Sequence, residues 1–412
     1  MDARTIIDYA KSLDCVHCGL CLNTCPTYRL TGREPSSPRG RIHLMRSLAE
    51  GEIQADADFA HEMDFCLLCR HCESVCPSGV KFGALMEHTR AGLAALEKRP
   101  LHVRLARAIG FGVLLRDRGA LSLAAALARV FAPARMPLRA ERAYQPTLTP
   151  AEGERTSAVL MLEGCVMSEI FGGVNRATAA VLARAGCEVR ATPQLFCCGS
   201  LHAHSGESSG ARALAREAIE ASEALCDERG APLPLVSNSA GCGAHLKELA
   251  ALFEEADPWH ARAAALSART LDFSQLLARE PQRSLLAARM RASSELAELS
   301  PIAWDDPCHL CHAQGVRREP RALLALLPGV TRVELAGSED CCGSAGAWSL
   351  THASESSALL EGKLEALRAS GARTLVTSNP GCHMQWDAGV RRAGLDVRVL
   401  HLAELLELAT RN

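Results

Sequence analysis

Long apolar runs are absent from this sequence of 412 residues. A membrane span needs about eighteen uninterrupted apolar residues, and the best stretch, residues 109–115, is short and lies between Arg107 and Arg116. The N-terminus also lacks the apolar region and small-residue cleavage site of a secretory signal. We therefore expect no transmembrane segment and no signal peptide, so that any membrane contact would be peripheral or made through a partner.

Excess charge and aromatic residues are scarce as well. The net charge is −2, which argues against nucleic acid as a partner. Aromatic residues make up 4% of the chain and arginine greatly outnumbers lysine, which we attribute to nucleotide composition rather than to function. No dinucleotide-binding fingerprint follows a predicted strand, since residues 343–346 hold only a fragment of one. Flavin chemistry is therefore expected in another polypeptide.

Cysteine, in contrast, is abundant, with 19 residues in the chain. Eight of them form two copies of the spacing CxxCxxCxxxCP, which is typical of bacterial ferredoxins with two [4Fe–4S] clusters. Three thiolates of each copy can reach one cluster, and the fourth points to the other cluster. The spacing therefore predicts one cluster on Cys15, Cys18, Cys21 and Cys76, and a second on Cys66, Cys69, Cys72 and Cys25.

Disulfides and structural zinc are the alternatives for these eight residues. Disulfides need an oxidising compartment, for which the sequence has no export signal. Zinc sites usually combine two CxxC pairs separated by a longer loop, rather than four cysteines within eleven residues. Both alternatives are weaker than the cluster interpretation.

The cysteine motifs, a polar proline-containing segment and an internal repeat divide the chain into four predicted parts. Residues 1–98 form the ferredoxin-type domain, with helices expected over 5–13, 41–50 and 82–98. Residues 99–156 form a helical connector and a polar linker; its helical part, 100–140, could lie on a membrane surface but is better interpreted as packing across the two domains. Two repeats follow, over residues 157–295 and 296–412.

The two repeats share a pattern of cysteines. Cys165, the pair Cys197–Cys198 and Cys242 recur as Cys308, the pair Cys341–Cys342 and Cys382, and the first interval is 31 residues in one copy and 32 in the other. Correspondence of this kind indicates a duplication.

Each repeat alternates predicted strands with helices, which argues for a parallel sheet with helical crossovers. Strands are expected over 158–162, 188–192, 233–237, 302–304, 331–335 and 374–377. Every cysteine of the pattern follows a strand, at the edge where open parallel sheets gather ligands. The predicted fold class is therefore α+β overall, a small helical ferredoxin-type domain followed by two α/β repeats with parallel sheets.

Four cysteines per repeat are enough for a tetrahedral zinc or for an iron–sulfur cluster, and the spacing does not choose between them. A third interpretation is that the four cysteines of each repeat bind no metal. Adjacent cysteines chelate a single metal ion only with strain, although they can reach different irons of an extended cluster. The additional candidate ligands are Cys165, Cys197, Cys198, Cys242, Cys308, Cys341, Cys342 and Cys382.

Several segments together resemble the iron–sulfur subunit of glycolate oxidase. These are SPRGRIHLM at 37–45, CLLCRHCESVCPSGV at 66–80, SAGCGAHLKEL at 239–249 and DPCHLCHAQGVRREPRALLALLPGV at 306–330, with the doubled CCG. The resemblance covers essentially the whole chain. It extends to the iron–sulfur subunits of lactate-utilisation and anaerobic glycerol-3-phosphate dehydrogenase systems, which pair with different flavoproteins.

The resemblance implies an electron-transfer subunit of an oxidoreductase complex, with no catalytic residue of its own for 2-hydroxy acids. An FAD-binding partner subunit would oxidise glycolate to glyoxylate, or D-lactate to pyruvate, and this chain would pass electrons to a quinone or other membrane acceptor. The expected location is the cytoplasmic face of the cell membrane, with peripheral association. The alternatives are a lactate or glycerol-3-phosphate dehydrogenase subunit, a heterodisulfide-reductase-like catalytic module in the CCG half, and a zinc-stabilised scaffold there.

The chain departs from the heterodisulfide reductase pattern, in which each CCG repeat ends in CxxC. Ser239 and Asn379 occupy the first of those cysteine positions, which counts against catalysis by the CCG half. The remaining cysteines and the histidines near the CCG motifs have the following expected roles. Cys311 is either a further ligand or a buried spectator, Cys187 and Cys226 are expected to be packing residues, and a structural role is favoured over metal ligation or proton relay for His202, His204, His309, His312 and His383.

Overall fold

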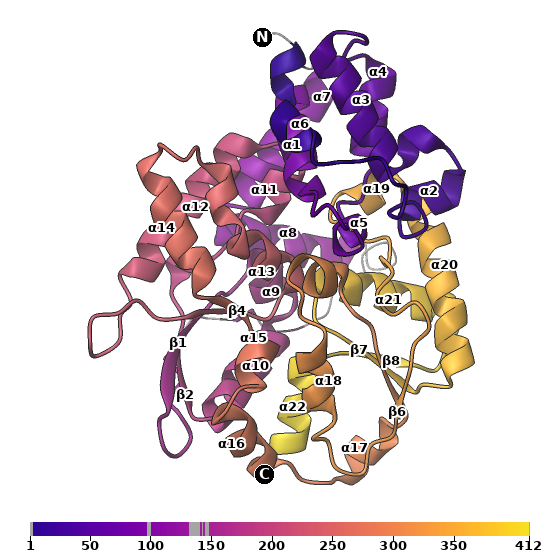
Figure 1. The fold of residues 1–412 in the computed structure, drawn as a ribbon. Coiled ribbons are helices and arrows are strands. Elements are labelled where there is room, and N and C mark those ends of the chain that lie inside the picture. Colours follow the sequence, from indigo (N-terminus) through magenta and orange to yellow (C-terminus); the bar gives the residue numbers. More distant parts are fainter. Residues whose placement is uncertain (1–2, 97–99, 132–140, 142, 145–147, 412) are drawn as a thin grey trace.

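The structure, a computed structural model, describes residues 3–96, 100–131, 141, 143–144 and 148–411 (Figure 1). Its N-terminal part consists of short helices around two cysteine-bearing loops. The helix expected over 5–13 is instead a 3-10 turn followed by a separate helix, because the Asp8 side chain accepts a hydrogen bond from Lys11 N and starts a new helix there. The helices are η1 (Ala3–Ile6), α1 (Tyr9–Ser12), α2 (Pro26–Thr31), η2 (Glu34–Ser36), α3 (Pro38–Glu50), α4 (Ala57–Asp64), α5 (His71–Ser74) and α6 (Phe82–Leu96).

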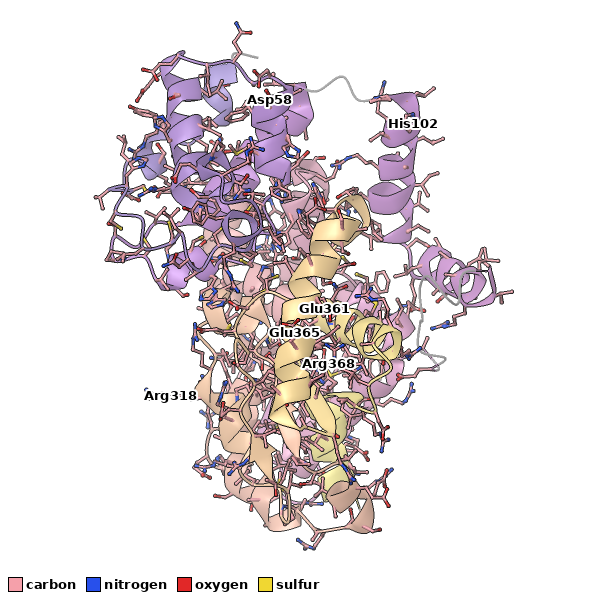
Figure 2. All side chains as sticks on the ribbon, turned by 90° about the vertical axis from the view of Figure 1, so that its right-hand side faces the viewer. Asp58, His102, Arg318, Glu361, Glu365 and Arg368 are labelled. Atoms are coloured by element: carbon pink, nitrogen blue, oxygen red, sulfur yellow. The ribbon has the colours of Figure 1, made fainter. Side chains whose placement is uncertain are left out.

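The connector contains α7 (Leu101–Ile109), a π-helical turn η3 (Gly110–Leu114) and α8 (Arg118–Phe131). These helices lie along one edge of the molecule, at the right of Figure 2. Part of the predicted helical stretch, residues 132–140, lies outside the described residues. Arg107 on α7 pairs with Glu207 of the first repeat, so the connector is attached to that repeat. No helix of the described residues could span a bilayer.

The two repeats each contain a four-stranded parallel sheet. The strand orders are β2-β1-β3-β4 and β6-β5-β7-β8, so both sheets have the same topology. The strands are β1 (Ser157–Met161), β2 (Cys187–Arg190), β3 (Leu235–Ser237), β4 (Thr270–Asp272), β5 (Ile302–Trp304), β6 (Arg332–Val333), β7 (Thr374–Thr377) and β8 (Arg398–His401). The predicted fold class and the expected parallel sheets are confirmed.

The two sheets share one apolar core, which contains residues from both repeats. Helices α10 (Gly172–Arg184) and α22 (Leu402–Thr410) pack against each other across the repeat boundary. Separate cores cover the outer faces of the two sheets. The remaining helices of the first repeat are α9 (Cys165–Ile170), η4 (Pro193–Leu195), α11 (Ser200–His204), α12 (Ser208–Glu223), α13 (Ala240–Lys247), η5 (Leu249–Leu252), α14 (Pro258–Ala268), α15 (Phe273–Leu277), α16 (Gln282–Arg289) and α17 (Ser294–Glu298).

Helix α20 (Ala353–Ser370) illustrates how the outer core forms. Leu360, Leu364 and Leu367 are buried on one side, while Glu361 and Arg368 form an ion pair of 3.2 Å on the exposed side (Figure 2). This spacing is that of an amphipathic helix on a sheet. The second repeat also contains η6 (His309–Ala313), α18 (Arg318–Leu324), α19 (Trp348–Thr351) and α21 (Pro380–Arg392).

Two strands and one ordered segment were not expected. β4 and β8 close the two sheets, and each ends in a residue that caps the following helix with its side chain, Asp272 before α15 and His401 before α22. The polar linker is also ordered in part, because the amide of Thr149 donates to Val189 O at 2.9 Å and pairs with the edge strand β2.

Candidate metal sites

The cysteines of each repeat come from three loops that follow strands. Cys165 follows β1 at the start of α9, Cys197 and Cys198 follow β2, and Cys242 follows β3 within α13. The second repeat places its cysteines after β5, β6 and β7 in the same way. Because parallel strands end at one edge of a sheet, the sequence prediction that these residues converge is confirmed.

The first thiol group consists of Cys165, Cys197, Cys198 and Cys242. Its thiols hydrogen-bond in a chain in that order. The hydrogen bonds from Cys165 and Cys198 hold the pKa of Cys197 well below its usual range. Both members of the adjacent pair therefore belong to one thiol group, despite the strain expected for a single metal ion.

The second thiol group consists of Cys308, Cys341, Cys342 and Cys382, and it repeats the same chain of hydrogen bonds. A hydrogen bond from Cys341 lowers the pKa of Cys308, but burial and the neighbouring thiols raise it overall to about 12. Buried thiols with raised pKa values keep their protons until a metal displaces them. Four converging sulfur atoms suit zinc or an iron–sulfur centre, so the residues fit such a group.

The two positions that lack the expected CxxC cysteine still contact the thiol groups. Ser239 hydrogen-bonds to Cys242, and Asn379 Nδ2 lies 3.4 Å from the Sγ of Cys382. A serine and an asparagine thus stand beside the thiols where a further ligand would be in the reductase pattern. Polar groups at this distance from a ligand sulfur tune a cluster without binding it.

The two N-terminal cysteine runs have the same unusual backbone. His17 and Gly19 flank Cys18 with φ values of 55° and 83°, and Leu68 and Arg70 flank Cys69 with φ values of 55° and 63°. Left-handed conformations are rare for residues other than glycine. Their recurrence at matching positions indicates that both loops are built to turn around a common kind of centre.

Cys25, the last cysteine of the first run, lies near Cys21 of its own run and near the second run. It interacts electrostatically with Cys69 and Cys72, which also interact with Cys66. Cys15, Cys21 and Cys76 pack against the same core of this domain, whereas Cys18 is exposed. The amide of Leu68 donates to Cys66 Sγ at 3.4 Å, and amide donors of this kind stabilise negative charge on sulfur.

The second run also contacts the second thiol group. Cys69 interacts with both Cys341 and Cys308, and these three cysteines share a small apolar cluster with Phe65 and Trp348. The Nε1 of Trp348 donates to Phe65 O at 3.2 Å. No spacing in the sequence indicated this contact.

Comparison with known proteins assigns both halves of the chain. The family "4Fe-4S dicluster domain" matches residues 11–80, and "Cysteine-rich domain" matches residues 159–247 and 302–387. The chain is 35% identical to the "Probable glycolate oxidase iron-sulfur subunit" of Bacillus subtilis (strain 168), over 97% of this chain and 94% of the relative. It is 34% identical to the "Glycolate oxidase iron-sulfur subunit" of Escherichia coli (strain K12), over 96% and 93%.

This chain belongs to the family of glycolate oxidase iron–sulfur subunits. More distant similarity extends to "Lactate utilization protein A" of Bacillus subtilis (strain 168), at 28% identity over 59% of this chain and 95% of that protein. The resemblance inferred from the sequence is confirmed, and the family match supports iron–sulfur clusters in the N-terminal domain.

A buried carboxylate lies two residues before the first cysteine of each thiol group. Glu163 pairs with Arg118 from the connector helix α8, and Asp306 pairs with Arg321 at 2.7 Å within the second repeat. The second group has in addition the buried ion pair of Lys363 and Asp305, at 2.8 Å. The surroundings of the two thiol groups therefore differ in charge although their thiols correspond.

The five histidines singled out in the sequence contact carbonyls, carboxylates and rings. The Nε2 of His309 lies 2.8 Å from Leu68 O, and burial lowers the pKa of His309 to about 3. His202 lies 2.8 Å from Phe111 O and His204 lies 2.6 Å from Glu87, while the ring of His383 packs edge-on against Phe171. These contacts agree with the structural role favoured for them.

The three remaining cysteines have local partners. Cys311 is buried, and its thiol lies 3.8 Å from Cys308 O. Ser157 Oγ donates to Cys187 Sγ in the sheet, and the thiol of Cys226 donates to Glu223 O. Cys187 has the packing role expected of it, whereas Cys226 is half-buried and lies outside the apolar cores of the described residues.

One histidine pair between the domains was missed in the sequence. His71 and His312 stack with ring centroids 3.9 Å apart, and Glu339 lies near both. Arg317 donates to both His312 Nδ1 and Glu339 at this site. A guanidinium in this position already neutralises the carboxylate and uses the imidazole lone pair, so the group acts as a polar contact between the domains.

Proposed function

We propose that this chain is the electron-transferring subunit of a multi-subunit oxidoreductase. An FAD-binding partner subunit oxidises glycolate to glyoxylate, or D-lactate to pyruvate, and the electrons leave through this chain to a quinone or other membrane acceptor. The names of the most similar relatives support glycolate oxidase as the complex. The expected location is the cytoplasmic face of the cell membrane.

The cysteine spacing and the proximity of Cys25 to the second run support one assignment of ligands to the two N-terminal clusters. One [4Fe–4S] cluster would be held by Cys15, Cys18, Cys21 and Cys76, and the other by Cys66, Cys69, Cys72 and Cys25. Such clusters, when bound, accept and release single electrons at potentials set by hydrogen bonds and burial. The chain itself buries the second set of thiols, supplies the Leu68 amide, and holds Cys69 against the second repeat.

The observation that carries the proposal is the contact between Cys69 and the second thiol group. A metal centre on Cys308, Cys341, Cys342 and Cys382 would lie next to the cluster on the second run. Both centres would be shielded from water by Phe65 and Trp348, which are buried. This arrangement supports onward transfer from the N-terminal domain into the CCG half.

Electron paramagnetic resonance of the anaerobic complex, purified through a tag on this chain, tests the proposal. Glycolate should produce reduced-cluster signals without a chemical reductant. If dithionite produces the signals and glycolate does not, the partner oxidises another substrate, such as lactate. Absence of any reduced-cluster signal with dithionite would contradict the electron-transfer function.

A zinc-stabilised scaffold in the CCG half is the second candidate, because four converging thiols also form the usual structural zinc site. Metal analysis of the full chain separates the two. Zinc in the wild-type chain that disappears in Cys197→Ser and Cys342→Ser variants, with iron unchanged, would support the scaffold. Iron and sulfide beyond the amount of two clusters, about eight of each, would support electron transfer.

A further inference from the structure

The connector helices present an apolar surface to solvent. Helix α7 is amphipathic, yet none of its residues is buried, and the same holds for the turn η3. Its leucine and isoleucine side chains recur every fourth residue, so they form a stripe on one side of the helix. Seven large apolar residues of α7, η3 and α8 are exposed, with exposed fractions from 46% to 77%: Leu101, Leu105, Ile109, Val113, Leu123, Leu127 and Val130.

Helix α8 has apolar side chains on its outer side. Ser122 and Arg129 face the first repeat, where Ser122 hydrogen-bonds to Glu169 and Arg129 donates to the Glu169 carbonyl at 2.9 Å. Leu123 and Leu127 point away from the repeat and are exposed. Leu121 and Ala125 pack inward as well, so the outer leucines form a second apolar face that the described residues leave uncovered.

The same segment is strongly basic. Residues 98–142 contain ten lysine and arginine residues and two acidic ones, a net charge of +8, so the rest of the chain carries −10. Of these cations, Lys98 and Arg99 precede α7 in the sequence, and Arg135, Arg139 and Arg142 follow α8. Arg107, Arg116, Arg118 and Arg129 bind the first repeat. An exposed apolar stripe within a segment of net positive charge is typical of a helix that lies in the surface of an anionic bilayer.

We propose that α7, η3 and α8 dock this chain on the surface of an anionic phospholipid membrane. The apolar stripe enters the boundary between headgroups and acyl chains, and the net positive charge of the segment attracts the anionic headgroups. A lipid surface fits better than a protein partner, since the exposed stripe is entirely leucine, isoleucine and valine, whereas protein interfaces are enriched in aromatic residues and methionine. The two helices lie along one edge of the molecule (Figure 2), so both can reach one flat surface.

This inference rests on the proposed function, in which the electron acceptor is in a membrane. The favoured interpretation of residues 100–140 as a helix packed across domains describes its inner side only. Arg107 and Arg118 attach the inner side to the first repeat. The outer side remains available for the membrane.

Co-sedimentation of the full-length, cluster-loaded chain with vesicles tests the inference. The probes are vesicles of phosphatidylcholine alone and of phosphatidylcholine with about one third phosphatidylglycerol. The wild-type chain should bind the anionic vesicles and lose affinity as salt rises. The double variant Leu105→Gln/Leu127→Gln should bind at least about tenfold more weakly, because two apolar insertions are lost.

The matched control is Leu350→Gln. Leu350 is 78% exposed on α19, outside the connector, so its variant should bind vesicles as the wild type does. Failure of the wild type to bind anionic vesicles, or unchanged binding by the double variant, would overturn the inference. Unchanged vesicle binding with loss of co-purifying flavoprotein would likewise overturn it and assign the surface to a protein.

Reduction of the clusters by glycolate in the soluble complex is measured separately from vesicle binding. The double variant should retain this reduction at the wild-type level. Loss of glycolate reduction in the wild type would count against the proposed function alone, whereas loss of vesicle binding counts against the membrane surface alone.

Discussion

Cys69 and Cys341 belong to different domains, and both lie in one buried apolar cluster of the folded chain. The contact is buried beneath Phe65 and Trp348. It gives the second cysteine run a different position from the first, whose Cys18 is exposed. We therefore expect the two N-terminal clusters to differ in function, with the one on the second run closest to the CCG half.

Replacing Cys69 by serine should remove one ligand of that cluster. Reduction of the partner's flavin by glycolate should remain, while onward transfer to an acceptor should fall to background. The measurement is flavin bleaching followed by reduction of an added quinone. Cys311→Ser is the matched control, because this buried thiol contacts only the Cys308 carbonyl among the described hydrogen bonds. Normal quinone reduction by the Cys69 variant would rule out this route.

Arg118 should matter far more for stability than its neighbour Arg116. Arg118→Gln leaves the fully buried Glu163 without its ion-pair partner, and an uncompensated buried charge costs about 3 to 5 kcal/mol. Arg116 pairs with Glu217 at an exposed position, so Arg116→Gln should change the free energy of unfolding by less than about 1 kcal/mol. Denaturant unfolding under anaerobic conditions measures both. Equal effects of the two variants would contradict the importance of the buried pair.

The strands that sequence patterns located best are β5 and β7. The expected boundaries of β5 and β7 coincide with those observed, because all their residues are buried and their apolar runs end in turn residues. β4 was missed because its three residues lie directly between two helices, α14 and α15. β8, with the sequence RVLH, has an exposed arginine at its start and too few apolar residues to be distinguished.

Contacts within a motif were predictable, but contacts between domains were not. The convergence of Cys165 with Cys242 follows from strand order, which is a regularity of parallel sheets. The contact of Cys69 with Cys341 and the stacking of His71 on His312 depend on how two domains dock. Docking depends on surface shape and charge, for which a single sequence has no periodic signal.

Stability should decrease as the pH falls below neutral. Burial lowers the pKa of His245 to about 4, from 6.5 in the unfolded chain, so the unfolded state binds more protons between these values. The free energy of unfolding therefore decreases as the pH is lowered through that window, by up to about 1.4 kcal/mol per pH unit for one histidine. Burial also lowers the pKa of His312 to about 4, which adds a contribution of the same sign.

Thermal unfolding midpoints at several pH values between 5.5 and 7.5 check this expectation, a range that spans the ordinary histidine pKa of about 6.5. In His245→Gln the slope of stability against pH should be smaller, because the unfolded state binds about one proton fewer in excess of the folded state. His102 is exposed on α7, and His102→Gln should leave the pH dependence unchanged. If His245→Gln and the wild type lose stability in parallel, His245 is not the group that titrates.

The two thiol groups should also be distinguishable by their effect on the N-terminal clusters. Cys308 and Cys341 interact with Cys69, whereas Cys165 and Cys197 pack with Leu115 and Leu121 of the connector. A paramagnetic centre on the second group would therefore alter the relaxation of the neighbouring cluster's resonance signal. Cys342→Ser should remove this effect, and the corresponding variant of the first group, Cys198→Ser, should preserve it.

Power saturation of the reduced-cluster signal at low temperature measures the difference. The comparison is matched, because both variants remove the second cysteine of a CCG motif and both residues are buried. Equal saturation in the wild type and both variants would mean that the second thiol group holds a diamagnetic ion such as zinc. In that case the contact at Cys69 fixes the domains to each other, and electrons leave the N-terminal clusters by another surface.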